Sequence, residues 1–170
     1  MGDQKQLVVF GLDDSDHSFY ALEWTLDHLI IPTTSAFKLL IIHARTSPTG
    51  VIGLAGPGAS DVVEAVESDV KRTATKVMEK AKEVCSNKGV KEVEFEVQDG
   101  DARNVACDVV DKHHATLLVL GSHGYGTFKR AVLGSVSDYC SHHANCSVMI
   151  VKKSKCSKLH AVNQTFQVIN

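Results

Sequence analysis

The stretch TLLVLGSHGYGTFKRAVLGSVS, residues 116–137, joins an apolar run to a string of glycines, cations and hydroxyls. Residues 117–120 are all apolar, which is typical of a strand buried on both faces of a parallel sheet. Gly121 follows directly, and Gly134 and Ser135 open the next helical pattern. Glycine lets the main chain approach a ligand or adopt a positive φ, and the first N–H groups of a helix attract anions. The stretch therefore predicts a phosphate-binding loop after a buried strand.

Apolar runs and helical patterns alternate along the rest of the chain. This alternation, with right-handed crossovers, predicts an α/β fold: a doubly wound, open parallel sheet with helices on both faces. Such sheets bind ligands at the carboxyl ends of their strands, where the strand order reverses. The predicted strands are residues 7–12, 37–44, 93–97, 117–120 and 148–151, and the predicted helices are residues 15–31, 60–88, 101–113 and 135–143.

Local signals refine several of these elements. The third strand run, VEFEV, alternates apolar and charged residues and is typical of an exposed edge. Gly89 marks the end of the second helix, and Asp101 is expected to cap the third. Asp14 is expected either to cap the first helix or to face water. A purely structural alternative for the glycine string is that the glycines make tight turns and Ser135 only caps a helix.

Composition excludes several classes of protein. The chain has 170 residues, 44% hydrophobic, with a formal net charge of −2, which fits one globular domain with its own core. This weak charge gives no electrostatic footprint for DNA or for an anionic membrane. No apolar run approaches the ~20 residues that span a bilayer, and no signal-peptide pattern is present, so stable membrane insertion is not expected. An odd number of irregularly spaced cysteines, five, predicts reduced thiols. The expected location is the cytoplasm, with the nucleus as the alternative.

The common phosphate-binding motifs are absent from this sequence. No G-x-x-x-x-G-K-[ST] occurs, and Gly124-Tyr125-Gly126 does not extend to G-x-G-x-x-G because Lys129 occupies the last position. The turn after the first strand, GLDDS, is acidic and does not suit a pyrophosphate. Asp13 suits instead a hydroxyl or amino donor, such as a ribose or a base. The run from Cys140 to Cys146 contains zinc-ligand types, but its spacing fits no familiar zinc finger.

The spacing from Gly121 to Ser135 resembles the signature G-x2-G-x9-G-[ST] of the ATP-binding universal stress proteins. The resemblance covers roughly residues 6–153, and ALEWTLDHLI from residue 21 is similar to the plant branch. It implies the flavodoxin-like sheet order 3-2-1-4-5. It also implies a domain at residues 1–153 and a C-terminal tail at residues 154–170.

The resemblance further implies a site for ATP or AMP across the first and fourth strand ends. Asp13 would contact the adenosine, and the main chain near Ala44 would hold the adenine. A Mg²⁺ or Mn²⁺ ion would accompany the phosphates. Where some members have proline after the first strand, this chain has Gly11-Leu12. The implied nucleotide-binding residues are Asp13, Ala44, Gly121, Ser122, His123, Gly124, Gly134, Ser135, Val136 and Ser137.

Three functions compete at this stage. The first is a stress-response regulatory protein that presents a nucleotide-dependent surface to protein partners and hydrolyses ATP slowly at most. The family's homodimers imply pairing through residues 147–151, since this apolar strand would otherwise be an exposed edge. The second is a genuine ATPase, although no general base and no nucleophile–base pair is evident, so no catalytic residue is assigned. The third is a chaperone (holdase) or scaffold that acts independently of nucleotide. The roles of residues 45–60 and of the tail stay open.

Overall fold

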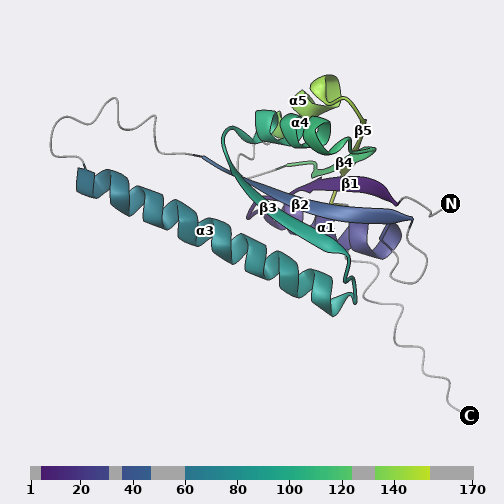
Figure 1. Ribbon diagram of the computed structural model, residues 1–170, viewed down its shortest axis with the longest axis horizontal. Coiled ribbons are helices and arrows are strands. Elements are labelled where there is room, and N and C mark those ends of the chain that lie inside the picture. Colours follow the sequence, from purple (N-terminus) through teal and green to yellow (C-terminus); the bar gives the residue numbers. More distant parts are fainter. Residues whose placement is uncertain (1–4, 31–35, 47–59, 124–132, 154–170) are drawn as a thin grey trace, which may run out of the picture.

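The computed structural model describes residues 5–30, 36–46, 60–123 and 133–153, and these form an all-parallel five-stranded sheet of order β3-β2-β1-β4-β5 (Figure 1). The predicted α/β class, the alternation of elements and the strand order are confirmed. The strands are β1 (Gln6–Gly11), β2 (Phe37–Arg45), β3 (Val93–Asp99), β4 (Leu117–Gly121) and β5 (Ser147–Val151). The helices are α1 (Asp16–His28), α3 (Ser60–Asn87), α4 (Ala102–His113) and α5 (Ser135–His143).

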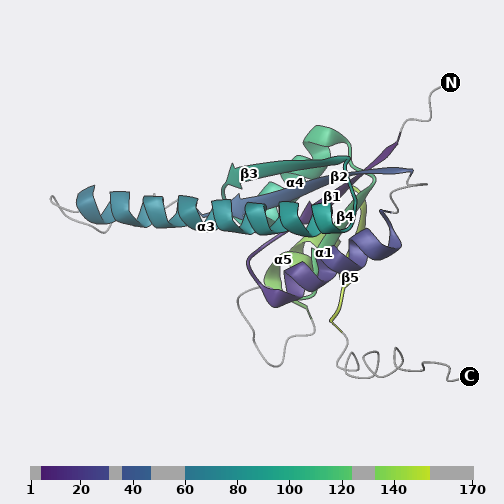
Figure 2. The same ribbon diagram turned by 90° about the horizontal axis from the view of Figure 1, so that it is seen from below.

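Helices cover both faces of the sheet (Figures 1 and 2). On one face, Phe10 and Ile41 pack with buried residues of α1 and α3. On the other, Val9 and Leu40 pack with α4 and with Cys140 of α5. Because successive strand residues point to opposite faces, a strand covered on both sides is apolar at every position. This explains the continuous apolar runs on which the strand predictions depend.

The edge strands and the helix ends follow the local signals. β3 lies at one edge of the sheet as predicted, and its Val97 is 40% exposed. α3 ends before Gly89, whose φ of +70° lies in the left-handed region that favours glycine. α4 is capped by Asp101, which accepts a hydrogen bond from the Arg103 N–H as expected. At α1 the cap is Ser15, so of the two roles expected for Asp14, exposure holds and capping does not.

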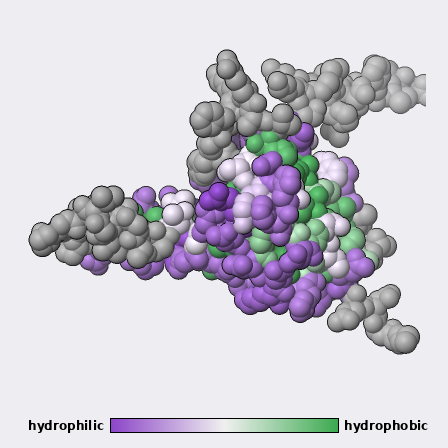
Figure 3. All heavy atoms as spheres, turned by 90° about the horizontal axis from the view of Figure 1, so that it is seen from above, coloured by the Kyte–Doolittle hydropathy of each residue, from purple (hydrophilic) through white to green (hydrophobic). Residues whose placement is uncertain are grey.

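α3 extends past the sheet as an arm (Figure 1), and the parts of this arm that are coloured in Figure 3 are mostly hydrophilic. The C-terminal half of α3 is anchored by buried residues such as Ala74, Val77 and Ala81, whereas Val66 nearer its start is 37% exposed. No helix in the described ranges has the length and apolar character needed to cross a membrane. Residues 47–59 of the loop expected at 45–60, and the tail at 154–170, lie outside the described residues.

Candidate functional site

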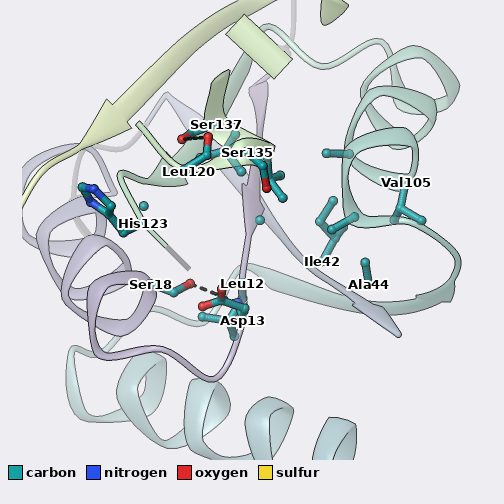
Figure 4. Close-up of a pocket in the computed structure, with 16 residues that line it drawn as sticks. Leu12, Asp13, Ser18, Ile42, Ala44, Val105, Leu120, His123, Ser135 and Ser137 are labelled. Carbon is teal, nitrogen blue, oxygen red and sulfur yellow. Dashed lines mark hydrogen bonds between the residues drawn. The ribbon is translucent and has the colours of Figure 1, made fainter. Parts of the chain in front are cut away.

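A pocket of about 180 Å³ opens at the carboxyl ends of β1, β2 and β4, beneath the starts of α4 and α5 (Figure 4). This is the edge where the strand order reverses, between β1 and β4, and where the topology predicts a ligand. The residues that line it are Gly11, Leu12, Asp13, Ser18, Ile42, Ala44, Ala102, Val105, Ala106, Leu120, Gly121, His123, Gly134, Ser135, Val136 and Ser137.

One wall of the pocket is apolar. Ile42 and Leu120 come from the strand ends, and Val105 and Ala106 come from the first turn and a half of α4. All four are at most 5% exposed, so the wall is continuous with the core that supports it. An apolar wall of this kind suits a flat ring, because ring and wall remove each other's apolar surface from water.

The turn after β1 holds a carboxylate at the lower side of the pocket in Figure 4. The Asp13 N–H donates to Ser18 Oγ at 3.0 Å. Asp13 Oδ1 accepts hydrogen bonds from the Ser15 N–H at 3.0 Å and from the Ser15 hydroxyl at 2.5 Å. Among the described residues Oδ2 has no partner, so the carboxylate is oriented by one oxygen while the other can accept from a ligand.

The start of α5 lies on the opposite side of the pocket. Gly134 is the N-cap, and no side chain in the described part of the chain caps this helix. Ser135 is the first helical residue, so the alternative that it serves only as a cap is wrong. The Ser137 hydroxyl, 2% exposed, donates to the Gly134 carbonyl at 3.0 Å. The first N–H groups of α5 make an electropositive rim, the arrangement that helix starts use to bind anions.

Gly121 lines the pocket for a reason that the sequence did not indicate. It is not among the described glycines with positive φ, which are Gly89 and Gly100. A Cβ atom at Gly121 would lie 3.2 Å from the His17 carbonyl oxygen and 3.3 Å from Ser18 Cα. The expectation of a positive φ at Gly121 is therefore wrong, and the close approach that needs glycine is made by the first turn of α1.

Of the ten predicted site residues, nine are described by the structure, and eight of these line the pocket. Ser122 is 2% exposed and lies behind the wall, where its N–H donates to the Val151 carbonyl and its own carbonyl accepts from the Gly134 N–H. Its Oγ lies 3.0 Å from Nδ1 of His123, which does line the pocket. Gly124 lies outside the described residues.

Sequence reasoning missed eight lining residues as site residues. Seven of them are glycine or apolar residues that the sequence patterns place within strands and helices. The α4 residues could have been found from topology, because a helix that follows an edge strand begins over the same sheet edge. Ser18 had no signal, since its role depends on the fold of the turn. The eight are Gly11, Leu12, Ser18, Ile42, Ala102, Val105, Ala106 and Leu120.

Three ionisable groups outside the pocket lining have shifted pKa values. The Arg103 guanidinium and N–H hold the pKa of Asp101 at about 2. Burial raises the pKa of Cys85 to about 11 and that of Cys140 to about 12, so both thiols stay protonated at neutral pH. The described residues contain no group of three or more His, Cys, Asp or Glu that could hold a metal ion.

Residues 6–152 match the model of the Universal stress protein family. The chain belongs to this family. It is 32% identical over 141 residues to a universal stress protein A-like protein of Arabidopsis thaliana, which covers 79% of this chain and 77% of that protein.

Solved structures of universal stress proteins share the fold. The UspA structure from Lactobacillus plantarum superposes with a TM-score of 0.73 at 18% identity, over 87% of this chain and 98% of that one. A universal stress protein family structure from Arabidopsis thaliana with AMP bound superposes with a TM-score of 0.64 at 24% identity, over 88% of this chain and 93% of that one.

Proposed function

We propose that this universal stress protein binds an adenine nucleotide, AMP or ATP, in the pocket at the carboxyl ends of β1, β2 and β4. The observation that carries the proposal is the pairing of two opposite surfaces in one pocket. The apolar wall at Ile42 and Val105 suits a base, and the uncapped start of α5 suits phosphates. The AMP bound in the solved Arabidopsis universal stress protein supports an adenine nucleotide as the ligand.

The proposal gives the lining residues separate roles. Asp13 accepts from a ribose hydroxyl or a base amino group through Oδ2, and the main chain at Ala44 contacts the base. His123, Ser135 and Ser137 lie toward the phosphates. The remaining predicted residues act through their main chains or, for Ser122, through its contact with His123. Mg²⁺ or Mn²⁺ would arrive with the phosphates of ATP, because the described residues form no metal site of their own.

The proposed role is regulatory, with slow ATP hydrolysis at most. Asp13, a pocket carboxylate, lies across the pocket from Ser135 in Figure 4. A general base would have to lie within hydrogen-bond reach of a water at the terminal phosphate. In this assignment Asp13 faces the nucleoside instead. The nucleotide then serves to stabilise one form of the surface that protein partners contact.

The test begins with the small molecules released when the purified protein is denatured, identified by mass spectrometry. Calorimetry then compares AMP, ATP–Mg²⁺, adenosine and inorganic phosphate. We expect AMP to bind more tightly than adenosine, since only AMP reaches the start of α5. AMP at a hundred times its Kd should stabilise the protein by ~2.7 kcal/mol. If no adenine nucleotide binds at millimolar concentration, the proposal is wrong.

A matched pair of variants separates pocket binding from binding elsewhere. Ala102 is the half-buried first residue of α4 and lines the pocket, so Ala102→Phe should fill part of it and weaken AMP binding at least ~10-fold. Asn104 lies in the same turn, is exposed and is not part of the lining. Asn104→Phe should leave AMP affinity unchanged.

The proposal extends to a homodimer that pairs through β5. This strand ends the sheet at the edge opposite β3, and its Val148, Met149 and Ile150 are half-buried. An apolar edge strand favours pairing with a second copy. Val148→Lys should lower the mass measured by light scattering from dimer to monomer, whereas Val97→Lys on the opposite edge should not. An unchanged mass in both variants would argue against pairing through β5.

The nucleotide-binding unit in this proposal is residues 1–153, and residues 154–170 form a C-terminal tail. A chain that ends at Lys153 is therefore expected to keep the AMP affinity of the full chain. A large loss of affinity in the same calorimetric assay would place part of the tail in the binding unit.

A further inference from the structure

The main chain of Leu12 is held at both of its polar groups by neighbouring residues of β2. Its N–H donates to the Ile42 carbonyl at 2.8 Å. Its carbonyl oxygen lies 2.8 Å from Nδ1 of His43. The paired register of β1 and β2 ends at Gly11 and Ile42, so the bond to His43 is a side-chain contact beyond the sheet ladder. The turn that leaves β1 is thus anchored by a residue of the neighbouring strand.

This contact fixes the tautomer of His43. A carbonyl oxygen can only accept a hydrogen bond, so Nδ1 carries the hydrogen. Leu12 is 4% exposed, and a carbonyl in such surroundings needs a protein partner because water does not supply one. His43 therefore acts as a donor toward the turn.

His43 does not line the pocket. Strand alternation places Leu39 and Ile41 in the core cluster on the α1 and α3 face, and Leu40 and Ile42 in the cluster on the α4 and α5 face. His43 lies on the same face of β2 as Leu39 and Ile41. It is absent from the pocket lining. Its effect on a ligand must therefore pass through the turn that it holds.

The route passes through one peptide group. The Leu12 carbonyl and the Asp13 N–H belong to the same planar peptide unit. His43 binds the oxygen of that unit, and Ser18 Oγ binds its N–H at 3.0 Å. Because both polar groups of this peptide unit are hydrogen-bonded, the unit cannot rotate. The direction of the main chain at Asp13 is therefore fixed. Asp13 Oδ1 is then held by Ser15, which leaves Oδ2 toward the pocket.

We propose that His43 is a positioning residue of the nucleotide site: it fixes the Leu12–Asp13 peptide from the opposite face of the sheet and so orients the Asp13 carboxylate. The proposal rests on the proposed function for its effect on nucleotide affinity. Its effect on the turn itself is independent of any ligand.

The test uses the position of the donor nitrogen. Asparagine Nδ2 takes the place of histidine Nδ1, whereas glutamine carries its nitrogen one atom further out, and leucine has none. We expect His43→Asn to keep AMP affinity within ~3-fold of the wild type, and His43→Gln and His43→Leu to weaken it by ~10-fold. His142 on α5 is a matched control, because its Nδ1 also contacts a main-chain oxygen, that of Asp138, at 2.9 Å. His142→Gln should leave AMP affinity unchanged.

Two ligand-free measurements distinguish a failure of this proposal from a failure of the proposed function. Nitrogen chemical shifts of the His43 ring should show a protonated Nδ1. Exchange of the Asp13 amide hydrogen should speed up in His43→Gln and His43→Leu and stay slow in His43→Asn. If the wild type binds no AMP, the proposed function is wrong, and the exchange rates still decide whether His43 positions Asp13. Unchanged exchange in His43→Gln, or equal losses in all three variants, would overturn the proposal.

Discussion

The helices around the pocket begin in two different ways. α1 and α4 are closed by side chains: Ser15 accepts from the Ser18 N–H, and Asp101 accepts from the Arg103 N–H. α5 begins at Gly134 without a side-chain cap in the described part of the chain. A capped start satisfies its own donors within the fold, whereas an open start leaves them to water or to a ligand. The starts of α1 and α4 therefore stabilise the fold, and the start of α5 is available for binding.

This division has a thermodynamic consequence. The closed starts stabilise the fold with or without a ligand. The open start gains its hydrogen bonds only when an anion arrives, so its contribution appears as ligand-dependent stability.

Gly121→Val should have the largest effect on the unfolding free energy. Gly121 packs against α1, whose start is capped, so the loss should be seen without a ligand. The added Cβ alone would lie within 3.3 Å of the main chain of His17 and Ser18 in α1. Helix main chain cannot give way as a flexible side chain can, so we expect the ligand-free protein to lose about 1–3 kcal/mol in a urea titration. Gly121→Ala should lose less.

Gly134→Ala, at the uncapped start of α5, is the control for this prediction. Gly134 has φ −73° and ψ 158°, which alanine adopts without strain. Its substitution should therefore cost only the difference between glycine and alanine at an N-cap, at most about 1 kcal/mol, and less than Gly121→Val. Equal losses at Gly121 and Gly134 would contradict the assignment of Gly121 to the contact with α1.

Ser135→Asp should separate stability from binding at the open start. A carboxylate in the first turn of α5 interacts favourably with the helix dipole, so ligand-free stability should stay equal or rise by about 0.3–1 kcal/mol. The same charge repels phosphate, so AMP affinity should fall at least ~10-fold in calorimetry. Ser141→Asp adds the same charge on an exposed position of α5 outside the pocket lining and should leave AMP affinity unchanged. Equal AMP affinities in the two variants would place the phosphate elsewhere.

The sequence predicted the fold well because each element had an unambiguous period. The runs at β1, β2 and β4 are nearly continuous in apolar side chains, and a sheet buried on both faces follows from that. The start of α5 was also predictable, since Gly134 with the serines at 135 and 137 opens the helical pattern that follows the loop after a buried strand.

The rest of the site depends on contacts between residues far apart in the chain. The contact of Gly121 with α1 was not predictable, because nothing in the sequence shows that α1 packs against the end of β4. His43 contacts the carbonyl of Leu12 across 31 positions, and only the parallel pairing of β1 with β2 brings the two together. Ser18 differs from other helix-face serines only by its bond to the Asp13 N–H. Local patterns identify elements, and tertiary packing decides which of their residues meet.

Asp101→Ala removes the cap of α4 and should lower the unfolding free energy at neutral pH by about 1 kcal/mol, as lost N-caps do. AMP affinity should change much less, because Asp101 does not line the pocket. Chemical denaturation and calorimetry on the same protein check both parts. A loss of affinity larger than the loss of stability would mean that the closed start of α4 also serves the ligand.

The unfolding free energy measured at acidic pH gives a second check on the Asp101 cap. Asp101 has a folded-state pKa of about 2, lowered from 3.8 mainly by its hydrogen bond to the Arg103 side chain. A lowered folded pKa means that the stabilisation is present above pH 4 and is lost as the pH falls from about 4 to about 2. Asp101→Asn keeps an acceptor oxygen without the charge, so its stability should fall less steeply across this interval than that of the wild type.

Arg103→Ala should have the smallest effect, because it removes an ion pair and leaves the cap. The donor to Asp101 in the cap is the main-chain N–H of residue 103, which alanine retains. The guanidinium pair with Asp101 is 48% and 43% exposed, and exposed pairs contribute about 0.2–1 kcal/mol. We expect a loss near 0.5 kcal/mol, part of it from the contact with the Tyr139 ring, and a smaller loss at high salt. A loss as large as that of Asp101→Ala would mean that the ion pair, and not the cap, closes the start of α4. The starts of α4 and α5 would then differ in charge and not in capping.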